Sequence, residues 1–287
     1  MTPGRETFHG VPALVLRASD GAQAVVTLQG GHVVSWRAAG SDVEQLYLSP
    51  ASLFADGKAI RGGVPVIFPQ FSDRGPFVRH GFARTMRWQL LRDDATDDGR
   101  SAQVVLGLTD DAASREQWPQ AFALALRVRV GGDALTMDMT CTNTGSSPWA
   151  FTAALHTYLA VHDVTRARLH GMAGTHFDDR VAGVFGVQGE APLQIDGEVD
   201  RVYASVTRAL RLDDPRPTGI RRLTIAQQGF TDVVVWNPGA MRCAALSDMP
   251  VDGYRHMLCV ESACITDPVT LDAGQLWTAS QTLTVAS

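Results

Sequence analysis

Lysine is almost missing from this chain: of 25 basic residues only Lys58 is a lysine, and arginine supplies the rest of the positive charge. Such a bias is better explained by the base composition of the coding DNA than by selection for guanidinium chemistry. The arginine count alone therefore does not indicate phosphate binding. With a formal net charge of −5 the chain also lacks a general basic surface, so we expect no nucleic-acid partner.

Cysteine is scarce as well, with four residues and no CxxC spacing. Cys141 and Cys259 lie in alternating apolar runs, which favours buried free thiols over disulfides or a metal site. No apolar stretch reaches the ~18 residues that a membrane span needs. The first ten residues lack the basic and apolar regions of a signal peptide. We expect a soluble, cytoplasmic protein without a membrane partner.

No segment sustains a helical apolar stripe, whereas short apolar runs with period-two alternation recur along the chain. The clearest pair is Phe122–Val130 and Ala134–Thr142, which flank Gly131-Gly132-Asp133 and predict a hairpin. The other predicted strands are Ala24–Leu28, Val33–Arg37, Gln103–Leu108, Leu223–Ala226, Asp232–Trp236 and Leu276–Val285. Many strands without crossover helices predict an all-β fold, a large antiparallel β-sandwich.

The remaining patterns concern helix, loops and domain number. Asp110–Trp118 predicts one short helix, because it begins with acidic residues and is followed by Pro119. The polar stretches Arg92–Ser101 and Asp213–Thr218 predict solvent-exposed loops. Neither a low-complexity linker nor a fixed-period repeat divides the chain. We therefore expect residues 1–287 to form a single domain, and the protein to be a monomer.

The stretch richest in chemistry runs from Ile60 to Phe71 and continues through Arg79–Arg84. It places Arg61, His80 and Arg84 beside glycine-rich turns. Guanidinium groups can give two parallel hydrogen bonds to an oxyanion, and glycine lets the backbone approach a ligand closely. This grouping suits an oxyanion such as phosphate better than a packed core.

Two further residues stand out by their context. Glu261 follows the apolar run Met257–Val260, where an ionised carboxylate is costly unless it is paired, hydrogen-bonded or used. His156 lies in Phe151–Leu159, which is mostly apolar or hydroxyl-bearing. From the residues alone, a strand-end glutamate facing water and a hydrogen-bonded core histidine remain the plainer interpretations.

These segments, with Leu155-His156-Thr157-Tyr158 and Val260-Glu261, resemble the hexose-6-phosphate mutarotases (glucose-6-phosphate 1-epimerases), a branch of the aldose 1-epimerase family. The resemblance runs along nearly the whole chain, from Gly30-Gly31-His32 to Leu271–Trp277. It implies the galactose mutarotase-like supersandwich and interconversion of the α and β anomers of a hexose 6-phosphate, with glucose 6-phosphate as the expected substrate. The reaction needs one base and one acid, so neither a cofactor nor a metal is expected.

The resemblance also implies roles for individual residues. Glu261 corresponds to the base that takes the C1 hydroxyl proton, and His156 to the acid that protonates the ring oxygen. Arg61 and Arg84 would bind the 6-phosphate. His80 would contact the ring oxygen or a hydroxyl, and Asp200 would accept from sugar hydroxyls or orient His156. Apart from the resemblance, the amide of Gln70 can bond sugar hydroxyls as both donor and acceptor. Arg74 and Arg79 are weaker phosphate candidates and are expected to be solvated loop charges.

Two departures and two alternatives stay open. Gly239 stands where the family often has tryptophan, and Ser262-Ala263-Cys264 replaces the residues expected in a loop after the base. One alternative is a non-catalytic carbohydrate-binding module that has lost function in that loop. The other is a mutarotase for unphosphorylated hexoses, which has no need of Arg61 and Arg84.

Overall fold

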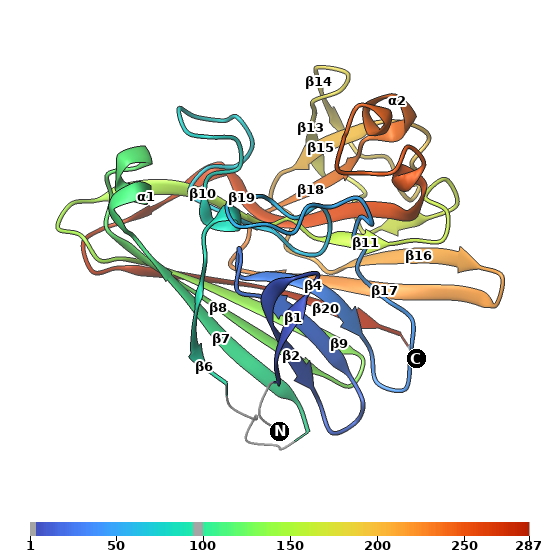
Figure 1. Ribbon diagram of the computed structural model, residues 1–287. Coiled ribbons are helices and arrows are strands. Elements are labelled where there is room, and N and C mark those ends of the chain that lie inside the picture. Colours follow the sequence, from blue (N-terminus) through green and yellow to red (C-terminus); the bar gives the residue numbers. More distant parts are fainter. Residues whose placement is uncertain (1–3, 94–99, 287) are drawn as a thin grey trace.

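The computed structural model describes residues 4–93 and 100–286, which form three antiparallel sheets (Figure 1). The smallest sheet has four consecutive strands at the N-terminal end of the chain. They are β1 (Gly4–Phe8), β2 (Val11–Arg17), β3 (Gln23–Thr27) and β4 (His32–Arg37). Every strand pair in the described ranges is antiparallel.

Two eight-stranded sheets make up the body of the molecule. One has the order β12-β16-β17-β20-β9-β8-β7-β6. Its strands are β6 (Gln89–Arg92), β7 (Ala102–Thr109), β8 (Phe122–Gly131), β9 (Ala134–Asn143), β12 (Arg168–His170), β16 (Leu210–Arg216), β17 (Gly219–Gln228) and β20 (Leu276–Val285).

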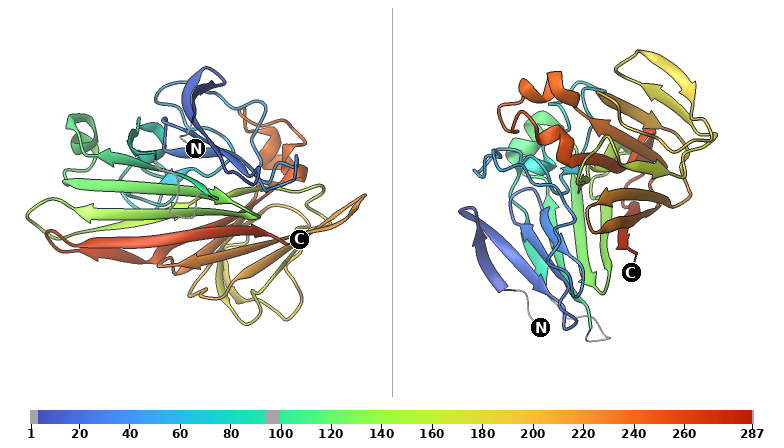
Figure 2. Two further views of the ribbon diagram at one scale, coloured as in Figure 1. Left: turned by 90° about the horizontal axis from the view of Figure 1, so that it is seen from below. Right: turned by 90° about the vertical axis from the view of Figure 1, so that its right-hand side faces the viewer.

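The other large sheet has the order β14-β13-β15-β18-β19-β10-β5, with β11 also paired to β19. Its strands are β5 (Val66–Ile67), β10 (Trp149–Leu155), β11 (Tyr158–Ala160), β13 (His176–Asp179), β14 (Val184–Val187), β15 (Val199–Tyr203), β18 (Asp232–Asn237) and β19 (Met257–Leu271). In Figure 1 the layer of β10 and β19 lies above the layer of β8, β9 and β20, and Figure 2 shows the same arrangement from two more sides.

One cluster of buried side chains joins the sheets. It includes Trp36 of the small sheet, Leu126 of one large sheet and Val260 of the other. The cluster forms because side chains alternate between the two faces of each strand. In β8, for example, every second residue from Phe122 to Val130 is buried. Full burial of a large apolar side chain stabilises a fold by roughly 1.5–3 kcal/mol, so this shared core holds the layers together.

The main predictions of secondary structure are confirmed. Strands β8 and β9 form the predicted hairpin, and Gly132 in its turn has φ +57. Strands lie at each of the other predicted ranges, and β20 begins and ends where predicted. The short helix is α1 (Ala112–Gln117), whose N-cap Asp111 accepts a hydrogen bond from the Ser114 backbone at 2.7 Å. The antiparallel all-β sandwich is thereby confirmed.

The predicted loop at Asp213–Thr218 is largely wrong: residues 213–216 belong to strand β16, and only Pro217 and Thr218 form the turn before β17. Its charges misled the interpretation, since Asp214 is completely buried. The Asp214 carboxylate pairs with Arg216 at 2.8 Å and with Arg221 at 3.3 Å. In the other predicted loop, Arg92 belongs to β6, whereas residues 94–99 lie outside the described residues.

No loop follows Glu261 either, because β19 continues to Leu271 and buries Ser262, Ala263 and Cys264. All four cysteines are buried and free, as predicted. The remaining helical elements are α2 (Gly239–Ala244) and the single turns η1 (Ala83–Thr85) and η2 (Gly253–His256). Within residues 4–93 and 100–286, no helix is long and apolar enough to cross a membrane.

Candidate active site

A cavity of about 190 Å³ opens on the face of the sheet that contains β15, β18 and β19. Strand pairing brings side chains from distant segments onto this face, with Asp200 opposite Trp236 and Val234 opposite Glu261. The segment between Arg61 and Arg84 supplies the facing wall. The cavity is lined by Arg61, Phe71, Ser72, Arg79, His80, Arg84, His156, Tyr158, Asp200, Val234, Trp236, Arg242, Leu246 and Glu261.

His156 and Glu261 meet in this cavity. Leu155, the last residue of β10, pairs with Ser262 of β19, which places the next residue, His156, beside Glu261. His156 Nε2 lies 3.4 Å from Glu261 Oε1, with side-chain exposures of 9% and 1%. The imidazole stacks on Tyr158 at 4.8 Å between ring centroids, and the Trp236 indole meets it edge-on at 6.1 Å. The aromatic rings keep this imidazole in a fixed orientation.

The environment pushes the two ionisable groups in opposite directions. Burial raises the pKa of Glu261 well above its ordinary value, and the Asp200 carboxylate adds to the effect. Burial lowers the pKa of His156 well below 6.5, and His80, Arg84 and Arg61 lower it further. In the described structure, Glu261 Oε2 and His156 Nδ1 have no hydrogen-bond partner. The free protein thus favours a neutral carboxyl beside a neutral imidazole, a pair suited to exchanging a proton with a ligand.

His80 is held in one tautomer by the backbone. The Ser72 N–H, which can only donate, lies 3.2 Å from His80 Nδ1, so Nδ1 accepts and the ring proton sits on Nε2. The residue has φ +66 and its ring meets His156 at 5.5 Å between centroids. Burial, followed by Arg84, Arg79 and Arg61, lowers the pKa of His80 to about 2. His80 is therefore a neutral hydrogen-bond donor on the cavity wall.

Arg61 enters the cavity from a double-glycine turn. Gly63 has φ +61, and a Cβ there would lie 2.3 Å from the Val33 carbonyl oxygen, so no larger residue fits. The Arg61 guanidinium is already engaged: Nη1 donates to the Tyr158 hydroxyl at 3.0 Å and Nε donates to Asp248 at 3.1 Å. Its positive charge is therefore paired with the Asp248 carboxylate.

Arg84 and Arg79 differ from Arg61 in their charge balance. Neither pairs with a carboxylate within 4 Å in the described ranges. Arg84 donates one hydrogen bond, from Nη2 to the Arg79 carbonyl oxygen at 3.0 Å, while its buried Nε has no partner in the part of the chain that is described. Burial lowers the pKa of Arg84, and Arg61 and Arg79 lower it further. These two arginines therefore form a positive wall without a direct ion pair to a carboxylate among the described residues.

The two remaining predicted residues differ in their location. Asp200 lines the cavity from β15, and burial raises its pKa. Gln70 is buried behind the wall and is not among the lining residues. Its amide donates to the Ser72 and Phe77 carbonyls at 3.0 and 3.2 Å and accepts from the Phe77 N–H at 3.0 Å. Gln70 thus shapes the segment that carries His80.

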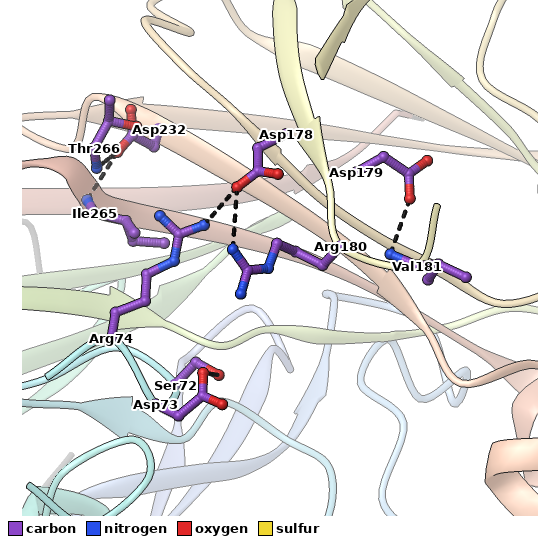
Figure 3. A network of polar contacts seen from close by, with 10 residues as sticks. All are labelled: Ser72, Asp73, Arg74, Asp178, Asp179, Arg180, Val181, Asp232, Ile265 and Thr266. Atoms are coloured by element: carbon purple, nitrogen blue, oxygen red, sulfur yellow. Dashed lines mark hydrogen bonds and ion pairs between the residues drawn. The ribbon is translucent and has the colours of Figure 1, made fainter. Parts of the chain in front are cut away.

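That segment is also anchored to the rim of the sheet (Figure 3). Asp178 of β13 pairs with Arg74 at 2.9 Å and with Arg180 at 3.4 Å. Asp73, beside Ser72, extends away from this network. The charge of Arg74 is therefore paired with Asp178 and holds the wall. Arg79 is exposed to solvent and also lines the cavity.

Sequence reasoning assigned no role to Asp248 or to the Tyr158 hydroxyl. Tyr158 lay within a recognised motif, but no signal pointed to Asp248, 187 residues from Arg61. Gly239 starts α2 with φ +60, where a Cβ would lie 2.7 Å from the Glu198 nitrogen, so the backbone requires glycine there. The aromatic side of the cavity is formed by Trp236 and Tyr158.

Comparison with known proteins agrees with this architecture. The model of the aldose 1-epimerase family matches residues 12–284. A Cenchrus ciliaris protein named "Putative glucose-6-phosphate 1-epimerase" is 34% identical over 280 residues, covering 95% of this chain and 84% of the relative. A Salmonella typhimurium protein of the same name is 33% identical over 270 residues, covering 92% and 87%.

A solved structure from Salmonella typhimurium, titled a putative mutarotase, superposes with a TM-score of 0.89 and 29% identity. The superposition covers 100% of this chain and 94% of that one, so the whole mutarotase architecture is shared. With a family match across 12–284 and relatives above 30% identity over most of its length, the chain belongs to the aldose 1-epimerase family.

Proposed function

We propose that this protein interconverts the α and β anomers of a hexose 6-phosphate, with glucose 6-phosphate as the first substrate to test. The observation that carries the phosphate assignment is the wall of Arg84 and Arg79, two cations without a carboxylate partner in the described structure, on the same cavity as His156 and Glu261. The family membership and the names of the two relatives support it.

Arg84 is partly buried and its Nε is fully buried without a partner among the described residues, so keeping it charged has a desolvation cost that a bound dianionic phosphate relieves. Arg84 offers its partnerless Nε together with the remaining guanidinium N–H groups. Arg61, whose orientation is set by Asp248 and Tyr158, adds a second donor group. An uncharged hexose gains nothing from these arginines, so they favour the phosphorylated substrate.

In the reaction, Glu261 takes the proton of the C1 hydroxyl while His156 gives a proton to the ring oxygen, which opens the ring. Rotation about the C1–C2 bond and the reverse proton transfers then close it on the other face. The Nε2–H of His80 donates to a sugar oxygen, and Asp200 accepts from sugar hydroxyls. Gln70 contributes by holding the wall rather than by direct contact.

The phosphate also matters for the acid. Arg84 and Arg61 are among the causes of the low pKa of His156. A bound dianion neutralises these two charges and therefore raises the pKa of His156 towards the protonated form that ring opening needs. Glu261 is then left as the carboxylate. Binding of the 6-phosphate thus favours the protonation states that the reaction needs, a protonated His156 and an ionised Glu261.

The test is two-dimensional NMR exchange spectroscopy on glucose 6-phosphate and galactose 6-phosphate, with glucose and galactose as unphosphorylated comparisons. We expect exchange between anomers to accelerate strongly for a hexose 6-phosphate and weakly for the free sugars. Equal acceleration for both classes would instead indicate a mutarotase for unphosphorylated hexoses. Saturable binding without any acceleration would indicate a carbohydrate-binding module.

A further inference from the structure

Cys259 carries a buried thiol next to His156 and Glu261, and the proposed reaction does not use this thiol. Cys259 and Glu261 are two residues apart on β19, so their side chains point to the same face of the sheet. Pairing of Tyr158 with Cys259 brings β11, and the preceding His156, to that same face. One ligand atom each from His156, Cys259 and Glu261 lie within 4.8 Å of one another, and all three residues are buried.

The distances suit a small tetrahedral metal ion. With metal–ligand bonds of about 2.0–2.3 Å, ligand atoms around a tetrahedral zinc are roughly 3.3–3.7 Å apart. The observed 3.4 Å between His156 Nε2 and Glu261 Oε1 already falls in this range. Since one ligand atom from each of the three residues lies within 4.8 Å of the others, the separations exceed the tetrahedral range by about 1 Å at most, which side-chain rotation can supply. The neighbouring cavity offers room for a water as the fourth ligand.

The ligand types and charges favour one class of metal. A thiolate, an imidazole and a carboxylate form a set that selects zinc and cobalt over magnesium and calcium, which prefer six or more oxygen ligands. Arg61, Arg79 and Arg84 face the same cavity and repel a bare cation. A thiolate and a carboxylate together cancel both charges of the metal, so the arginines meet a neutral cluster.

We propose that His156, Cys259 and Glu261 form a binding site for Zn²⁺, and that the ion inhibits the enzyme by occupying its acid and base. The thiol proton, and any proton on the carboxyl, leave to solvent when the metal binds. The lone pairs of His156 Nε2 and Glu261 Oε1 then hold the metal and no longer exchange protons with the sugar. Because the inhibitory consequence rests on the proposed function, binding is tested separately from activity.

Binding is tested with Co²⁺, which reports cysteine ligation through a sulfur-to-metal charge-transfer band in the near ultraviolet. Wild type should show this band and saturate at one ion per chain. Cys259→Ser should abolish it. Cys243→Ser is the matched control, because Cys243 is buried in the same apolar cluster as Cys259 but is not one of the three ligands. A band that survives in Cys259→Ser, or that never forms in wild type, overturns the site.

Inhibition is tested by titrating Zn²⁺ into the anomer-exchange assay, each variant being normalised to its own rate without metal. The concentration for half-inhibition should rise by at least about tenfold in Cys259→Ser and stay unchanged in Cys243→Ser. Mg²⁺ at the same concentrations should have no effect. Cys259→Ala serves as a second variant if the serine form melts early. Equal zinc sensitivity of wild type and a folded Cys259 variant overturns the proposal. If wild type does not accelerate anomer exchange at all, the proposed function is wrong, and the cobalt spectrum still tests the metal site.

Discussion

Removing Arg84 is the sharpest test of phosphate recognition. In the free protein Arg84 makes one hydrogen bond, to the Arg79 carbonyl, and its buried Nε has no partner among the described residues. A charge-assisted hydrogen bond from such a group is worth about 1.5–3 kcal/mol. Arg84→Ala should therefore weaken apparent affinity for glucose 6-phosphate by about ten- to hundredfold.

The loss should appear mainly in KM, because a contact at C6 is present in both the ground and the transition state. Exchange of free glucose should not fall, since removing Arg84 also removes one cause of the low pKa of His156. Arg61→Ala should weaken the apparent affinity for glucose 6-phosphate less than Arg84→Ala does, because the Arg61 charge is already paired with Asp248. The double variant should bind glucose 6-phosphate more weakly than either single variant.

The assay is NMR exchange of both sugars, corrected for spontaneous mutarotation. Arg242→Ala is the matched control: Arg242 also lines the cavity, but it is paired with Glu198 at 2.8 Å, and its loss should change KM by less than about threefold. Equal losses for glucose 6-phosphate and glucose would refute the reasoning, because Arg84 would then be holding the fold or the sugar ring.

Three further predictions concern the acid–base pair and the glycine turn. Glu261→Gln and His156→Ala should each lower exchange by about 10²–10⁴-fold at saturating substrate while glucose 6-phosphate still binds; near wild-type turnover in either would reject its role. The pKa of Glu261 is raised above its ordinary 4.5, so the folded state keeps a proton that the unfolded state has lost, and stability falls as pH rises. The free energy of unfolding in urea, measured for Glu261→Gln relative to wild type, should therefore increase as the pH is raised from about 5 to about 8. A difference that stays constant with pH would contradict the raised pKa of Glu261. Gly63→Ala should destabilise by more than about 3 kcal/mol and reduce exchange, whereas Gly132→Ala, with a similar φ but nothing within 4 Å of the added Cβ, should cost only about 1–2 kcal/mol; equal thermal shifts would contradict the steric argument.

Much of the fold was predictable from local pattern. Strand alternation places every second side chain on one face, so the hairpin of β8 and β9 and the range of β20 follow from the residues themselves. The turn at Gly132 and the cap at Asp111 are local in the same way. Recognition of the segments around His156 and Glu261 likewise needed only their own residues, and the structure places both on one cavity.

Other features depended on contacts that only the pairing of strands brings about. Asp214 sits in a segment polar enough to predict a loop, yet Arg216 and Arg221 neutralise it in a completely buried position. A sequence shows that a carboxylate is present, but not whether folding brings a cation to it. The cost of burial is therefore invisible until the partners are placed.

The sequence by itself determined the all-β class, the family and the candidates for acid and base. Only the tertiary structure decided which arginine is already paired, since Asp248 reaches Arg61 from 187 residues away. It alone brought Cys259, predicted as a buried free thiol, within 4.8 Å of the ligand atoms of His156 and Glu261. The physical reason is that periodicity is a property of neighbouring residues, whereas strand register, burial and charge pairing are set by segments that meet only in the folded protein.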